Sequence, residues 1–170
     1  MAKQETQTLL SKGVLVDKGD PRIGFRGCLD SLSAAVVELQ IAGLNVGNGS
    51  LAEELEEVRA KIYEIMSCEV TGKKCEPLTL WGLDADEIRE RSHHPARYFG
   101  IGHIRPHYTM GVVAAKLNTL RTKVREAELV ACRALQDRID IVEVLNRLSS
   151  AIYVLAYKYL PEGYSETVRF

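Results

Sequence analysis

Apolar residues recur every three or four positions along most of the chain, a spacing that predicts helices rather than strands. No segment alternates apolar and polar residues convincingly with a period of two. The pattern therefore predicts one domain of the all-α class, a five-helix bundle. We expect its helices over residues 25–42, 50–72, 85–91, 109–136 and 139–159.

Each long helix carries an apolar stripe that we expect to form the core. These stripes are Leu29, Leu32, Val36 and Leu39; Leu55, Val58, Ile62 and Ile65; Val113, Leu117, Leu120, Val124, Ala127 and Ala131; and Ile141, Leu145, Leu148, Ile152 and Leu155.

The first helix has a second apolar stripe, formed by Ala34, Val37 and Ile41, with Asp30 in line with it. A helix that is apolar on two sides is expected to be buried on two sides. This pattern predicts that the first helix lies in the centre of the bundle or at a subunit interface.

Caps and breakers divide the chain further. Ser50 with Glu53, and Asp84 with Glu87, have capping-box spacing, and Gly72 is expected to end the second helix. The segment Ser92–Gly111 contains all four histidines, and loops of this length are usually functional or disordered. We divide the chain into an irregular N-terminal segment (1–24), the helical bundle (25–160) and a C-terminal tail (161–170).

Composition narrows the classes of function. The net charge is -1 over 170 residues, so nothing favours a nucleic-acid partner. The four cysteines form no C-x-x-C pair, and we see no signal peptide. We therefore expect a cytoplasmic protein whose cysteines are free thiols. Apolar runs fall well short of the roughly 20 residues of a membrane span, and we expect no membrane association.

Three charged residues of the fourth predicted helix, Arg121, Arg125 and Glu128, fall beside its apolar stripe rather than opposite it. Two arginines four residues apart repel each other unless an anion compensates them. One interpretation is that Glu128 and Asp30 supply carboxylates in interhelical ion pairs. The other is that the arginines bind an anionic ligand, beside a similar polar flank of the fifth helix formed by Asn146, Ser149 and Tyr153.

Three motifs favour the second interpretation. The segments "DPRIGFRGCLDSL", "LRTKVREAE" and "LNRLSSAIYVLA" resemble the PduO-type corrinoid adenosyltransferases, in the same order, over residues 17–160. The segments "RTKVRE" and "LNRLSS", and the loop "SHHPARY", are most similar to those of the ethanolamine-utilisation branch.

The resemblance implies a five-helix bundle that assembles as a homotrimer with active sites between subunits. It also implies transfer of the 5'-deoxyadenosyl group from ATP, with Mg²⁺, to cob(I)alamin, which gives adenosylcobalamin. Arg121 and Arg125 match the arginines that contact nucleotide phosphates, Glu128 the glutamate beside them, and Asn146 an asparagine that contacts the nucleotide. Asp30 matches the aspartate that pairs with the first arginine across the subunit boundary. Asp30, Arg121 and Arg125 are thus the expected catalytic residues.

The family also binds the corrinoid against an apolar wall. We expect Phe99, Ile104 and Tyr108 of the long loop to form this wall, although aromatic loop residues more often simply pack the loop against the core.

The chain departs from the family at its start, where it has no counterpart of the glycine-rich "TGDxG" loop. Lys18, which we expect to bind ATP, Lys12, or amides near Gly13 would have to replace that loop.

Ethanolamine-type members can carry an N-terminal extension with a His and a Cys-Cys-x-x-Cys cluster, and this sequence shows no such cluster. Cys68 and Cys75 have no histidine near them in sequence, and a histidine-rich loop (His93, His94, His103 and His107) more often hydrogen-bonds than binds an ion. We therefore expect no protein-bound metal.

An alternative function is a corrinoid-binding or delivery protein with little catalysis, and a third is a structural bundle within a metabolic assembly. An adenosyltransferase would have as partners a cobalamin-dependent lyase and a cobalamin reductase. We expect a cytoplasmic location, with association with a bacterial microcompartment as a further expectation.

Overall fold

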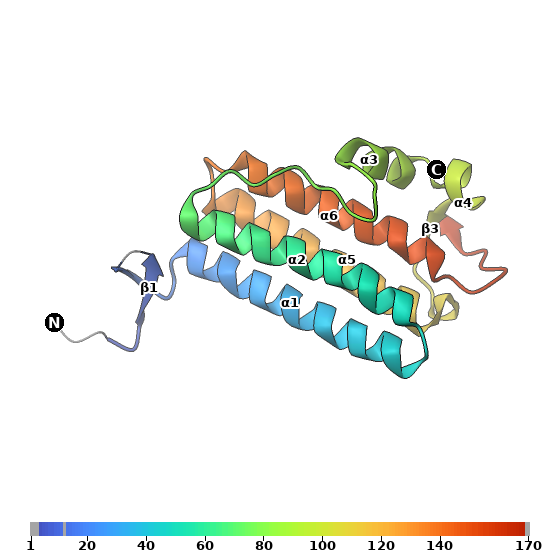
Figure 1. The fold of residues 1–170 in the computed structure, drawn as a ribbon, viewed down its shortest axis with the longest axis horizontal. Coiled ribbons are helices and arrows are strands. Elements are labelled where there is room, and N and C mark those ends of the chain that lie inside the picture. Colours follow the sequence, from blue (N-terminus) through green and yellow to red (C-terminus); the bar gives the residue numbers. More distant parts are fainter. Residues whose placement is uncertain (1–3, 12, 169–170) are drawn as a thin grey trace.

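The computed structural model describes residues 4–11 and 13–168, and its body is a bundle of long helices (Figure 1). The first long helix contacts the second and the third, and the third also contacts the fourth. The four are α1 (Pro21–Asn45), α2 (Gly49–Thr71), α5 (Gly111–Ala134) and α6 (Ile139–Lys158).

Shorter elements lie at the edges of the bundle. They are helices α3 (Ala85–His93) and α4 (Pro95–Phe99), the 3-10 turn η1 (Tyr108–Met110), and two antiparallel strand pairs, β1 (Gln7–Ser11) with β2 (Val14–Asp17) and β3 (His103–Ile104) with β4 (Thr167–Val168). The predicted helical bundle is confirmed, whereas the expectation of helices alone is wrong. Four strands too short for a period-two signal, and α4 inside the histidine-rich loop, escaped the sequence pattern.

The predicted core is confirmed in all four long helices. Every residue of the four predicted stripes is buried except Val113, which is half-buried beside the core. α3 packs on α6 and adds Ile88 to the same core. The spacing of apolar residues thus identified the inward faces correctly.

The second stripe of α1 faces outward. Val37 is 41% exposed and Ile41 is 54% exposed, and Ala34 is also exposed. Of the two positions predicted for α1, the centre of the bundle is therefore wrong, because only its first stripe is covered by the chain's own helices. The alternative, a subunit interface, stays a prediction. By length and composition alone, α1 meets the criteria for a membrane span, which the core helix of a soluble protein also meets.

Helix ends follow the capping rules, with one correction. Asp84 and Glu87 form the predicted capping box, and Gly72 ends α2 with a φ of 74°. The predicted box at Ser50 is wrong, because Asn48 caps α2 by accepting a hydrogen bond from the Leu51 amide at 3.3 Å.

The N-terminal segment, expected to be irregular, contains the hairpin β1–β2. The hairpin projects beyond the end of the bundle where α1 begins (Figure 1), and its Leu9, Val14 and Leu15 are exposed. Asp20 then caps α1 through the amide of Arg22, with Pro21 as the first helical residue. Lys12 lies outside the described residues.

Candidate functional site

The two arginines of interest lie one turn apart on α5 and border a small cavity of about 160 Å³ between α3, α5 and α6. Helical spacing places both side chains on the flank that faces α6. The polar groups around the cavity can all donate hydrogen bonds to an oxyanion. Its lining comprises Arg121, Arg125, Ser92, His93, Ser149, Ser150 and Tyr153.

Arg121 is half-buried and held from two sides. Its Nε donates to Asn118 Oδ1 at 3.2 Å, and its guanidinium lies over the Tyr153 ring, 5.8 Å from the centroid. Burial, and after it the positive charge of Arg125, lower the pKa of Arg121. The two cations therefore disfavour each other in the chain alone, as their spacing predicts.

Neither arginine forms an ion pair within the described part of the chain. Glu128, the expected partner of Arg125, instead accepts a hydrogen bond from Asn146 Nδ2 at 2.9 Å. The interpretation that Arg121 and Arg125 form ion pairs between helices of this chain is thus wrong for the described residues. Arg125 is exposed at the cavity, so its charge is available to a ligand.

Tyr153 connects this cavity to the loop that precedes α5. Its hydroxyl accepts from the Ile104 amide at 2.9 Å, lies 2.8 Å from the Tyr157 hydroxyl and lies 3.3 Å from His103 Nδ1. Tyr157 in turn donates to the Gly102 carbonyl at 2.9 Å. Burial, and then the hydrogen bond with Tyr153, raise the pKa of Tyr157, so the Tyr157 phenol stays protonated.

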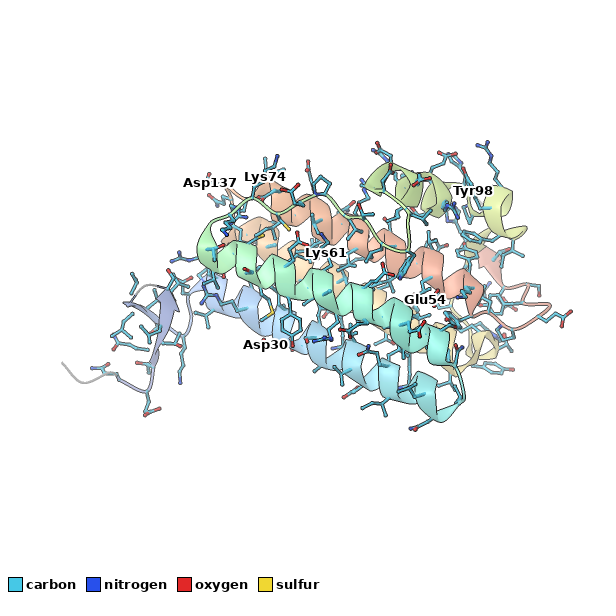
Figure 2. The ribbon with its side chains drawn as sticks, viewed as in Figure 1. Asp30, Glu54, Lys61, Lys74, Tyr98 and Asp137 are labelled. Atoms are coloured by element: carbon cyan, nitrogen blue, oxygen red, sulfur yellow. The ribbon has the colours of Figure 1, made fainter. Side chains whose placement is uncertain are left out.

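Asp30 does not meet Arg121 within the chain. It lies exposed on α1 (Figure 2), on the side of Tyr63 of α2. Hydrogen bonds with Ser33 and then Arg59 lower the pKa of Tyr63, and the Asp30 carboxylate opposes that shift.

Lys18, the ATP-binding residue expected in the N-terminal segment, is exposed in the turn between β2 and α1. Its amide donates to the Thr6 carbonyl at 2.8 Å. No contact between Lys18 and either arginine is recorded in the described part of the chain.

The expected apolar wall is divided between two environments. Phe99 stacks on Tyr157, with ring centroids 4.4 Å apart, and Ile104 is only 8% exposed. Tyr108, by contrast, is 88% exposed beside His107. Phe99 and Ile104 thus pack the loop against α6, and Tyr108 alone presents an open aromatic surface.

A larger hollow of about 420 Å³ adjoins the arginine cavity and shares His93 with it. Sequence reasoning missed Ser92 and His93 as lining residues of the arginine cavity, although the Asp84 cap and Pro95 bracket the helix that carries them. The hollow is lined by Glu90, His93, His94, Pro95, Ala96, Arg97, Gly102 and His103.

Residues 2–159 match the family model described as cobalamin adenosyltransferase. The chain belongs to this family. Among curated adenosyltransferases, it is 39% identical over 163 residues to the corrinoid adenosyltransferase EutT of Escherichia coli, and equally to that of Salmonella typhimurium. The match covers 90% of this chain and 58% of each relative, so the chain spans little more than half the length of these adenosyltransferases.

Solved adenosyltransferase structures have the same fold. A variant of the PduO-type ATP:corrinoid adenosyltransferase from Lactobacillus reuteri, complexed with cobalamin and ATP, superposes with a TM-score of 0.69 over 96% of both chains at 18% identity. A second variant of that enzyme, complexed with ATP, gives a TM-score of 0.63 at 19% identity, over 91% of this chain and 89% of the other. The family resemblance inferred from the three motifs is confirmed.

Proposed function

We propose that this chain is an ATP:cob(I)alamin adenosyltransferase that uses the arginine cavity to hold the phosphates of ATP. The observation that carries the proposal is a pair of arginines, one turn apart beside a cavity, with no carboxylate partner in the described part of the chain. Guanidinium groups bind phosphate oxygens in bidentate fashion, and each phosphate charge relieves their mutual repulsion.

The chemistry requires such a clamp. Cobalt(I) attacks C5' of the ribose, a cobalt–carbon bond forms, and the C5'–oxygen bond breaks with its electron pair leaving on triphosphate. Arg121 and Arg125 stabilise the charge that develops on this leaving group and hold C5' in line with the metal. No side chain has to remove a proton, because the nucleophile is the reduced cobalt of the substrate itself.

The remaining polar residues orient the nucleotide. The Ser149 and Ser150 hydroxyls already donate to the Asn146 carbonyl and are within the cavity lining, ready to exchange that bond for a phosphate oxygen. Mg²⁺ enters with ATP, since phosphate oxygens and water supply most of its ligands, and it offsets phosphate charge. We expect Glu128, which follows Arg125 by three residues on α5 and accepts a hydrogen bond from Asn146, to interact with this ion.

The test is an anaerobic assay with cob(I)alamin and MgATP, followed by the absorbance change when the cobalt–carbon bond forms. Arg125→Ala should reduce turnover by at least about 100-fold, the loss typical when one group that stabilises transition-state charge is removed. Arg133→Ala removes an exposed arginine from the same helix and should retain activity. A wild-type protein that binds cobalamin without turnover would instead be a delivery protein.

We further propose that the chain assembles as a homotrimer through the exposed stripe of α1. Val37 and Ile41 present an apolar surface that the chain itself leaves uncovered, with Asp30 in line with it. In this arrangement Asp30 pairs with Arg121 of the neighbouring subunit and completes the site.

Light scattering coupled to size exclusion should give a mass three times that of the 18.9 kDa chain. Val37→Glu should reduce the measured mass to that of a single chain. Asp30→Asn should weaken both assembly and turnover, whereas Asp137→Asn, an exposed aspartate between α5 and α6, should change neither. A monomeric wild-type protein at assay concentration would contradict the trimer.

The branch resemblance supports ethanolamine utilisation in the cytoplasm as the setting, with a cobalamin-dependent lyase as consumer of the product and a reductase as supplier of cob(I)alamin. Co-purification of this chain with a microcompartment shell fraction would support an association with that assembly.

A further inference from the structure

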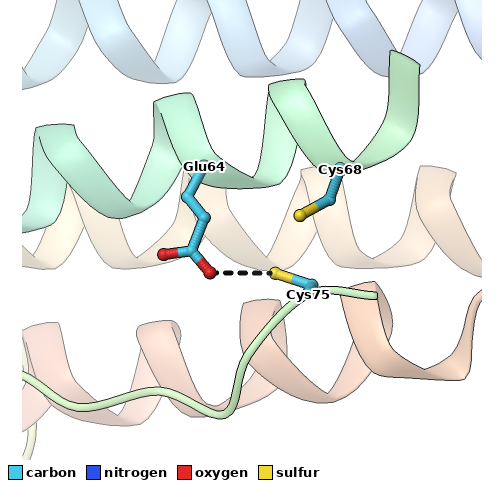
Figure 3. Close-up of side chains that lie close together, drawn as sticks. All are labelled: Glu64, Cys68 and Cys75. Atoms are coloured by element: carbon cyan, nitrogen blue, oxygen red, sulfur yellow. Dashed lines mark hydrogen bonds between the residues drawn. The ribbon is translucent and has the colours of Figure 1, made fainter. Parts of the chain in front are cut away.

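A second group of reactive side chains lies at the end of α2, outside the arginine cavity. Glu64 and Cys68 are one turn apart on that helix, and Cys75 approaches them from the extended segment that follows (Figure 3). One ligand atom from each residue lies within 4.8 Å of the others, and Cys68 and Cys75 are only 7% and 2% exposed. The Cys75 thiol donates to Glu64 Oε1 at 3.8 Å.

These separations suit a tetrahedral zinc ion. With Zn–S bonds of about 2.3 Å and Zn–O bonds of about 2.0 Å, tetrahedral angles place sulfur and oxygen about 3.5 Å apart and two sulfurs about 3.8 Å apart. The observed sulfur–oxygen distance of 3.8 Å is therefore close to that of a filled site before any adjustment.

The backbone around the two cysteines is held in place independently of an ion. Arg138 donates to the carbonyl of Cys68 at 2.9 Å and to that of Lys73 at 2.7 Å, and the Cys75 amide donates to Asp140 Oδ2 at 2.7 Å. The Cys75 thiol is thus presented toward Glu64 by a fixed loop, and the Cys68 thiol, on α2, donates to the Lys74 carbonyl of the same loop at 3.6 Å. This fixed geometry lowers the entropy cost of assembling the ligands.

Local charge also fits a thiolate centre. Two thiolates and one carboxylate around a divalent ion leave one net negative charge. The Lys61 ammonium, 2.7 Å from Glu64 Oε2, offsets that charge, and the Arg138 guanidinium lies close by.

We propose that Glu64, Cys68 and Cys75 bind one zinc ion per chain, with water as the fourth ligand. Each thiol gives up its proton to solvent as it binds, and no electron is transferred. Thiolate ligands favour zinc over magnesium, so this ion is distinct from the one that accompanies ATP. The ion joins the end of α2 to the segment that runs on to α3, a structural role that does not depend on the proposed function. Sequence spacing missed the group because the third ligand comes from a helical turn before the first cysteine.

The experiment uses the whole reduced protein, incubated with zinc chloride, desalted and measured by native mass spectrometry. One zinc per chain is expected. Cys68→Ala and Cys75→Ala should each weaken zinc binding by more than about 100-fold. Loss of a residue that only hydrogen-bonds to a metal ligand costs at most about that much, and loss of the ligand itself should cost more. Cys132→Ser, which removes an exposed thiol of α5, should bind like the wild type.

Cobalt(II) in place of zinc should give sulfur-to-metal charge-transfer absorption that both cysteine variants lose. If these variants fail to fold, Glu64→Gln serves instead, with weaker zinc binding and the charge-transfer band retained. A reduced wild-type protein that binds no zinc overturns the proposal. So does a chain two hydrogens lighter, with Cys68 linked to Cys75 as a disulfide, as purified under anaerobic conditions.

Discussion

Removal of one hydroxyl, in Tyr153→Phe, tests whether Tyr153 of α6, which borders the arginine cavity, also positions the loop that precedes α5. The hydroxyl lies within hydrogen-bond distance of the Ile104 amide, His103 and Tyr157, so three contacts are lost while the ring under Arg121 remains. The Ile104 amide keeps one longer contact, 3.3 Å to the Tyr157 hydroxyl, so it is not left unpaired.

The expected loss is about 1–2 kcal/mol, the range for a net hydrogen bond whose partner is partly compensated. For a chain of this size each kcal/mol corresponds to about 2–4 °C, so the melting temperature should fall by about 2–8 °C. Amide hydrogen exchange should accelerate at Ile104 and its neighbours, because the hydrogen bond from the Ile104 amide to the Tyr153 hydroxyl is lost.

The assay is thermal denaturation by circular dichroism together with hydrogen exchange, with Tyr98→Phe as control. Tyr98 is 39% exposed, and its hydroxyl has no recorded hydrogen bond within the described residues. Its variant should match the wild type. An unchanged melting temperature and unchanged exchange at Ile104 in Tyr153→Phe would refute the reasoning.

Two further changes test local features of the bundle. Gly72 has a φ of 74° and no atom within 4 Å of an added Cβ, so Gly72→Ala should lower the free energy of unfolding by about 1–2 kcal/mol through backbone strain alone. Gly72→Asn should cost less, because asparagine tolerates this conformation. Equal losses in chemical denaturation would contradict the backbone explanation. Hydrogen bonds from Arg59 and then Gln40 lower the pKa of Glu56 to about 2, so its contribution to stability is present above its unfolded pKa of about 4.3 and is lost as pH falls through about 2. A carboxyl NMR titration of Glu56 with a midpoint above about 4 would show that the pair does not form.

The sequence predicted the parts of the fold that depend on periodicity. Leu117, Leu120 and Val124 are buried as their spacing requires, because a helix turns its residues through a fixed angle. The pair of strands β1 and β2 escaped because strands of five and four residues give too few alternations to count. The cap at Asn48 was misassigned because Ser50 and Glu53 match the same local pattern two residues later.

The candidate site was predictable only in part. Arg121 and Arg125 could be identified on one helix, since their spacing and the nearby apolar stripe define their direction. Glu128 and Asn146 meet across α5 and α6, a contact set by how the helices pack rather than by either sequence alone. Glu64 and the two cysteines likewise meet only because Arg138 fixes the loop that carries Cys75.

The two arginines, which have no carboxylate partner within the described part of their own chain, also bear on turnover. In the proposed reaction the two arginines that bind the phosphates of ATP also bind the phosphates of the released triphosphate, because both carry the same oxyanions. Product and ATP then compete for one cavity, so the last step of each cycle is an electrostatic exchange. In such a protein inorganic polyphosphates act as inhibitors, and rising salt speeds departure of the product while it weakens capture of the nucleotide.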